Sequence, residues 1–140
     1  GYITEANHYN RNGDLKEKWI HKYDENGNRI EENRFGQNGK LVFKFTLNYD
    51  ENGNAIDGNS YTKKGKILYK YTFKYDNNKN FIEKNMLEPS GVTISKIAYT
   101  YSFDKNGNWI KRITYRMDIT SAIHKNDVPT NITKREIEYF

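Results

Sequence analysis

The stretch KYDENGNRI at Lys22–Ile30 recurs three times along the chain. The later copies read NYDENGNAI at Asn48–Ile56, KYDNNKNFI at Lys74–Ile82 and SFDKNGNWI at Ser102–Ile110. Successive copies lie 26, 26 and 28 residues apart. A fixed period of this length is typical of repeat proteins, in which each repeat is one small structural unit.

Each repeat also holds two turn signals, such as Asn26-Gly27 and, half a period later, Asn38-Gly39. Asn-Gly favours a tight hairpin because both central residues of a type I′ turn need positive φ. We therefore expect two strands in each repeat. In the third copy Lys79 stands where the others have glycine, which predicts a strained or different turn there.

The turn type decides which residues face each other beside it. A two-residue type I′ turn would place Tyr23 opposite Ile30, and a three-residue loop with Gly27 in a G1 bulge would place Tyr23 opposite Arg29. We favour the first register. It predicts aromatic–aliphatic cross-strand pairs in every repeat.

Between the turns, apolar and polar residues alternate, as in LVFKFTLNY at Leu41–Tyr49. The alternation returns at 67–75 and 97–103 and predicts strands with one aromatic face. The intervening segments 28–35, 54–62 and 80–87 are more polar, so we expect them to bury less. The fold class predicted is all-β: an antiparallel up-and-down meander of about ten strands, forming a single twisted sheet that curls over its aromatic face in one domain, 1–140.

The two ends extend this pattern. Tyr2–Asn10 and Asp14–Asp24 read as a first hairpin, and Trp109–Arg116 and Ile132–Phe140 read as closing strands. The connection Met117–Asn131 is irregular, and we expect a loop around Pro129 because proline lacks an amide donor.

Composition narrows the class of protein. Only 35% of the 140 residues are hydrophobic, which argues against a thick two-sided core. The chain nevertheless has 12 Tyr, 7 Phe and 2 Trp, and this aromatic content excludes a disordered chain. The net charge is +5, and the basic residues are spread over the predicted strands instead of forming one cluster. This distribution favours a solvated lysine-rich face over a nucleic-acid binding site. No apolar stretch reaches the ~20 residues of a membrane span.

The polar motifs favour structure over catalysis, and we expect no metal, no cofactor and no enzyme activity. The turn from Asp24 resembles a calcium loop only at its start, because glycine falls at the fourth place and Phe35 occupies the twelfth, where a glutamate is required. The histidines, His8, His21 and His124, have no zinc-like spacing. There is no cysteine. Acidic residues such as Glu31 and Glu83 are expected to meet neighbouring lysines.

Aromatic residues are the candidate binding sites. Tyrosine and tryptophan can stack on sugar rings while nearby polar groups bind the hydroxyls. Trp19, Tyr61, Trp109 and Tyr115 are the ones expected to be least committed to the centre of the sheet. The alternative is that they only pack the sheet or cover its ends.

The recurring Tyr-Asp-x-x-Gly-Asn resembles the YD-repeat group, related to Rhs repeats and loosely to MORN repeats. Gly107–Arg112 and Ile132–Tyr139 are similar to stretches in short secreted or lipid-anchored YD-type proteins of Bacteroidetes. The resemblance implies a β-repeat fold and a bacterial, extracytoplasmic location, with a possible lipid anchor upstream. For some relatives it also implies sugar binding. It supplies no catalytic residues.

We therefore expect a non-catalytic module at the cell surface, in the periplasm or secreted, that binds a polysaccharide or a protein. The alternative is a purely structural repeat that self-associates through its edge strands.

Overall fold

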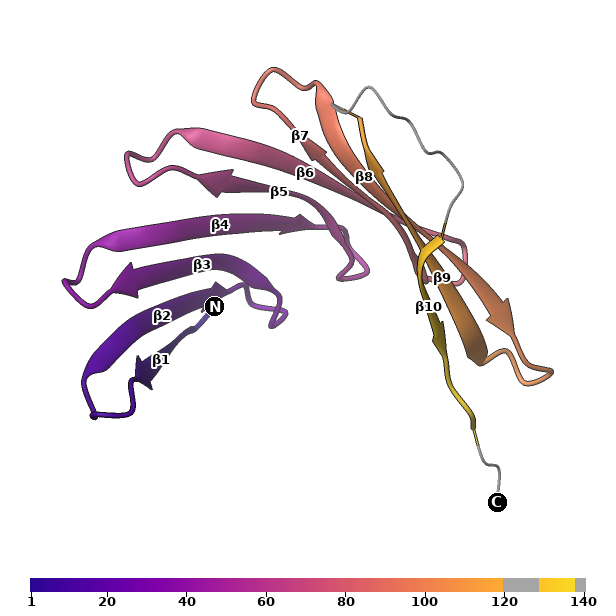
Figure 1. Ribbon diagram of the computed structural model, residues 1–140, viewed down its shortest axis with the longest axis horizontal. Helices are drawn as coiled ribbons and strands as arrows, with labels where there is room; N and C mark the ends of the chain where they lie inside the picture. Colours follow the sequence, from indigo (N-terminus) through magenta and orange to yellow (C-terminus); the bar gives the residue numbers. More distant parts are fainter. Residues whose placement is uncertain (120–128, 138–140) are drawn as a thin grey trace. The chain divides into compact units, whose positions relative to one another are not determined.

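The computed structural model describes residues 1–119 and 129–137 and is all-β there, with no helix that could cross a membrane. Its strands are β1 (Ile3–Tyr9), β2 (Leu15–Tyr23), β3 (Arg29–Gly36), β4 (Leu41–Tyr49), β5 (Ala55–Tyr61), β6 (Ile67–Tyr75), β7 (Phe81–Leu87), β8 (Thr93–Phe103), β9 (Trp109–Asp118) and β10 (Pro129–Lys134). They form one antiparallel sheet in chain order (Figure 1). The predicted ten-stranded meander is confirmed.

The chain divides into two compact units. The N-terminal unit holds residues 1–71 together with 88–91, and therefore β1 to β5 and the first half of β6. The C-terminal unit holds 72–87 and the residues from 92 onward, and therefore the second half of β6 and β7 to β10.

The aspartate of each Tyr-Asp motif organises its turn. Asp24 Oδ1 accepts hydrogen bonds from the backbone N–H groups of Asn26, at 3.0 Å, and Asn28, at 2.8 Å. The side-chain amide of Asn28 donates to the other carboxylate oxygen, and this bond is the largest cause that lowers the pKa of Asp24. The same backbone bonds recur at Asp50, Asp76 and Asp104. The motif is therefore turn chemistry, and the described residues contain no cluster of three metal-ligating side chains.

The favoured type I′ register is wrong beside the turn. Tyr23 pairs with Arg29, and Ile30 is an extra residue that is 37% exposed. Gly27 adopts φ 84° in the G1-bulge position, which lets the aspartate bind two amides of a three-residue loop. Tyr49–Ala55 and Phe103–Trp109 repeat this arrangement, so the expected aromatic–isoleucine pairs do not form.

Lys79 keeps the same turn at a conformational cost. Its φ is 63°, the one positive value at a non-glycine residue in the described chain. Its N–H still donates to the carbonyl of Asp76 at 3.0 Å, as Gly27 does to Asp24 at 3.3 Å. Of the two expectations for this turn, the strained one is therefore correct.

No hydrophobic residue of the described chain is buried, so the absence of a thick core is confirmed. The buried side chains with polar groups are Glu32, Ser60 and Thr114, on β3, β5 and β9. Two of these side chains, Glu32 and Ser60, show that the segments 28–35 and 54–62 bury more than expected, because a large aromatic side chain on β4 lies opposite each of them. Phe45 on β4, for example, lies opposite Ser60.

The two faces of the sheet differ in chemistry. Aromatic rings share one face, which we call the aromatic face: Phe45 and Tyr71 lie 5.3 Å apart in the N-terminal unit, as do Phe81 and Tyr99 in the C-terminal unit. The other face, which we call the ion-pair face, carries lysine–glutamate pairs. There Glu31 lies 2.8 Å from the ammonium groups of Lys22 and Lys44, which join three strands.

Glu83 repeats this bridge in the C-terminal unit, between Lys74 and Lys96. Partial burial alone would raise the pKa of Glu31 and of Glu83. Hydrogen bonds from the two lysines and a nearby asparagine outweigh this effect and lower the pKa of each carboxyl group to about 2. The expectation that these carboxylates meet lysines is confirmed.

The C-terminal strand differs from its prediction. Pro129 begins β10 and the loop expected there is strand, because an edge strand tolerates proline and a bulge next to it absorbs the mismatch. The strand ends at Lys134, before the expected Phe140; residues 135–137 are not strand, and 138–140 lie outside the described residues. Of the predicted connection Met117–Asn131, residues 120–128 also lie outside them.

Candidate functional site

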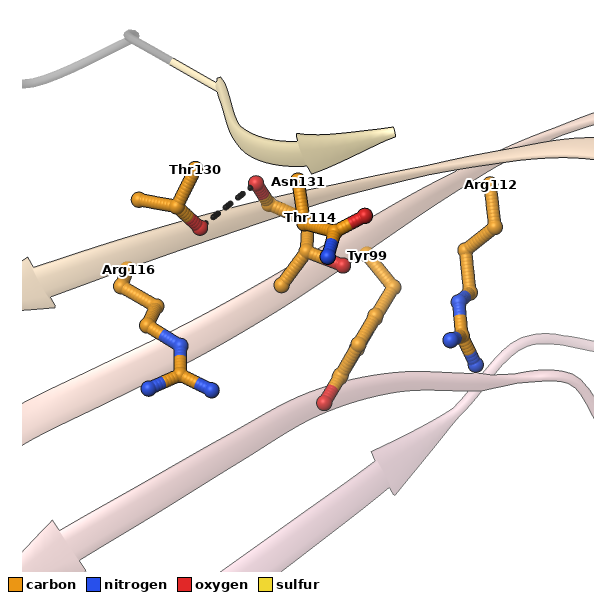
Figure 2. Close-up of a pocket in the computed structure, with 6 residues that line it drawn as sticks. All are labelled: Tyr99, Arg112, Thr114, Arg116, Thr130 and Asn131. Atoms are coloured by element: carbon orange, nitrogen blue, oxygen red, sulfur yellow. Dashed lines mark hydrogen bonds between the residues drawn. The ribbon is translucent and has the colours of Figure 1, made fainter. Parts of the chain in front are cut away.

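A polar hollow of about 370 Å³ lies on the aromatic face of the C-terminal unit. Its lining residues come from three adjacent strands: Tyr99 from β8, Arg112, Thr114 and Arg116 from β9, and Thr130 and Asn131 from β10. Figure 2 shows the two arginine side chains on either side of Tyr99 and Thr114. The volume falls in the lower part of the range for ligand pockets.

Strand alternation brings these side chains together. Arg112, Thr114 and Arg116 are two residues apart, so they project from the same face of β9. Thr114 pairs with Tyr99 on one side and with Asn131 on the other. One row across three strands therefore forms the floor of the hollow.

The floor is held by hydrogen bonding at β10. The Thr130 hydroxyl donates to the Thr114 carbonyl at 3.0 Å, and Thr114 is only 8% exposed (Figure 2). The register shift between Pro129 and Asn131 leaves Thr130 as the extra residue that makes this contact. A bulge that re-aims a side chain is a common feature of functional sites.

Arg112 is held in place by aromatic rings. Its guanidinium carbon lies 5.4 Å from the ring centre of Tyr99 and 5.9 Å from that of Trp109. Its Nε atom is buried and makes no hydrogen bond. Burial raises the pKa of the adjacent Tyr101, and Arg112 opposes that rise. The guanidinium is therefore fixed by packing, with one donor unused.

The hollow has no compensating negative charge among its six lining residues. Neither Arg112 nor Arg116 forms an ion pair with any residue that the structure describes. Arg116 is exposed and Arg112 is half-buried. The arrangement can attract an anionic group and offer it several N–H donors.

The repeat supplies an internal comparison for Arg112. Counted from the conserved turn asparagine of each copy, the same position holds Glu32, Gly58, Lys84 and Arg112. Glu32, 6% exposed, lies 2.9 Å from the Arg29 guanidinium and 2.6 Å from that of Arg34. The first repeat thus contains its own anion between two arginines, whereas the last repeat has a cation at that position.

The four predicted ligand-binding residues do not form one site. In the N-terminal unit Trp19 lies on the aromatic face, with the Arg34 guanidinium 4.0 Å from its ring, while Tyr61 lies on the opposite face beside Lys44. In the C-terminal unit Trp109 lies on the aromatic face under Arg135, at 4.1 Å, and Tyr115 lies on the other face opposite Ala98. Their role in ligand binding stays a prediction.

Sequence reasoning missed all six residues that line the hollow. The alternation of Arg112, Thr114 and Arg116 was visible, and counting back from the last Asn-Gly turn would have placed Arg112 opposite Tyr101. Asn131 gave no comparable signal, because no short turn fixes its register with β9.

No family model and no curated protein sequence matches the chain. Among solved structures, that of TcdB2-TccC3 is similar, with 17% sequence identity and a TM-score of 0.43. The match covers 81% of this chain and 7% of the other, so this chain spans only a small part of that protein's length.

Proposed function

We propose that the protein is a non-catalytic binding module that holds a glycan in the hollow of the C-terminal unit. One observation carries this proposal: an aromatic ring, two threonines, an amide and two guanidinium groups line a single cavity of about 370 Å³. Small-ligand sites commonly join an apolar or aromatic surface to a few convergent polar groups.

The lining suits a sugar in particular. Tyr99 presents a flat ring on which the C–H face of a pyranose can stack. Asn131 is exposed and offers both a donor and an acceptor to neighbouring hydroxyls, and the arginines add further donors. Sugar recognition needs this mixture because each ring has one apolar face and several hydroxyl groups at its edge.

The same lining supports binding without chemistry. None of the six side chains is a carboxylic acid or a histidine, the groups that most often act as general acid or base. Glycoside hydrolysis would call for two carboxyl groups across the cavity. We place the module outside the cytoplasm because of its resemblance to exported YD-type proteins.

The test is a calorimetric titration of the purified chain against neutral and acidic bacterial and plant polysaccharides. Asn131→Ala removes one lining side chain from an exposed edge position, and Asn59→Ala, on the other face of the N-terminal unit, is the matched control. Saturable binding that weakens only in Asn131→Ala supports the proposal. Absence of binding across the panel, or equal loss in both variants, refutes it.

A self-associating scaffold is the second candidate. All seven residues of β1 are exposed, and β1 and β10 are the edge strands of the sheet in this chain. Edge strands offer unpaired backbone groups to another copy. Sedimentation velocity over a range of concentrations separates the two candidates, because a binding module sediments as a constant species without ligand.

A further inference from the structure

We propose that the hollow selects an acidic sugar, whose ring carboxylate binds between Arg112 and Arg116. This inference rests on the proposed glycan-binding function and names the class of glycan. It predicts a carboxylate as the group that the two guanidinium groups recognise.

The charge of the lining favours an anionic ligand. Two of the six lining side chains are cationic and none is acidic, and neither guanidinium is neutralised within the described chain. On the same face of the N-terminal unit, by contrast, Arg29 and Arg34 are both neutralised by Glu32. Near the first repeat turn the arginines are therefore paired with an internal carboxylate, whereas near the last repeat turn Arg112 and Arg116 can bind an external one.

Arg112 is preorganised to bind a carboxylate. Arg112 is packed against Tyr99 and Trp109 and keeps its buried Nε–H without a partner. A guanidinium presents its N–H groups as a planar fork that fits the two oxygens of a carboxylate. Because packing already fixes this side chain, binding a carboxylate costs little conformational entropy.

The spacing of the two arginines fits a single sugar ring. Arg112 and Arg116 lie four residues apart on one strand, about 13 Å along the backbone. Both side chains extend over the hollow, with Tyr99 and Thr114 between them (Figure 2). A sugar ring placed against Tyr99 would have one guanidinium on each side. Arg112 would supply the fixed contact and the exposed Arg116 an adjustable one.

The experiment compares matched pairs of oligosaccharides by calorimetry with the whole chain. Oligomers of galacturonate, glucuronate and mannuronate are each tested beside the carboxyl-reduced form, which is the same sugar without the charge. We expect at least one acidic oligomer to bind about tenfold or more tighter than its reduced partner, because charged hydrogen bonds are the stronger ones. The preference should shrink as salt is raised.

Variants assign the preference to the two arginines. Arg112→Gln and Arg116→Gln should each reduce it, and Arg112→Lys should retain part of it. Lys111→Gln removes the same charge from the opposite face of β9 and should leave the preference unchanged. Since Arg116 is exposed, its variant tests the inference even if Arg112→Gln fails to fold.

The possible failures are distinguishable. If reduced and acidic oligomers bind equally, the acidic-sugar inference is overturned and the glycan-binding function stands. If no sugar of either kind binds, the proposed function itself fails. A preference that Lys111→Gln lowers as much as Arg112→Gln also overturns the inference.

Discussion

Replacing Glu83 by glutamine should remove two ion pairs that link neighbouring strands on the ion-pair face. Its carboxylate binds the ammonium groups of Lys74, at 2.8 Å, and Lys96, so it connects β6, β7 and β8 within the C-terminal unit. Glutamine keeps the size of the side chain and loses the charge. The variant therefore isolates the electrostatic contribution of the bridge.

The structure sets the magnitude. The pKa of Glu83 falls from 4.5 to about 2 on folding, which corresponds to about 3 kcal/mol if the whole effect were retained. The side chain is only 14% exposed, but it lies on one face of a single-layer sheet, where water screens it. We therefore expect Glu83→Gln to lower the free energy of unfolding by about 1–2 kcal/mol at pH 7.

The effect should depend on pH with a definite sign. Because the carboxylate's pKa is lower in the folded chain than in the unfolded chain, its stabilisation is complete above about pH 5. It is lost as the pH falls from there toward about 2. The wild type and the variant should therefore approach equal stability near pH 2.

Urea unfolding followed by circular dichroism, at pH 7, 5, 3 and 2, measures this difference. Glu31→Gln should behave in the same way, since the pKa of Glu31 is also lowered to about 2. Glu25→Gln, in an exposed turn, is the control and should change little. A loss of stability that stays constant down to pH 2, or a loss no greater than that of Glu25→Gln, would refute the electrostatic reasoning.

Three further variants test the backbone and packing. Lys79→Gly should raise stability by about 0.5–1 kcal/mol, because it relieves a positive φ of 63° and the gain exceeds the entropy that glycine loses; a lower melting temperature would contradict this. Gly58→Ala should lower the melting temperature, since its new Cβ would lie 2.5 Å from the Thr46 carbonyl oxygen, and an unchanged melt would show that the strand can shift. Tyr101→Phe removes the hydroxyl that donates to the Phe81 carbonyl at 2.7 Å and should cost about 1 kcal/mol by urea unfolding, whereas no loss would mean that water replaces the bond.

The fold could be predicted because its determinants are local. Each turn of the Asp-x-Asn-Gly-Asn type, including the third, in which Lys79 replaces the glycine, joins two neighbouring strands, so the repeat fixes strand number, order and direction. The bodies of the hairpins also follow the expected pairing, as with Lys22 and Glu31. The error was confined to the residues next to each turn, where the aspartate's hydrogen bonds favour a three-residue loop over a type I′ turn.

The candidate site was harder to predict because it depends on three strands at once. Aromatic residues were the obvious candidates, yet the extra residue Ile110, in the bulge beside the turn, places Trp109 and Tyr115 on opposite faces. Thr130 and Asn131 were expected in a loop because of the adjacent proline, and their pairing with β9 depends on contacts distant in sequence. When a long connection joins two strands, as between β9 and β10, no short sequence motif indicates their register.

Chemical-shift mapping tests the central claim, that the hollow of the C-terminal unit is the binding site. ¹⁵N-labelled chain would be titrated with galacturonate, glucuronate and mannuronate oligomers, and with their carboxyl-reduced forms, while backbone amide resonances are followed. We predict that the largest changes cluster at Tyr99, Arg112, Thr114 and Asn131, with residues 1–71 unaffected. Changes centred on residues 1–71, or no saturable change with any of these sugars, would contradict the account.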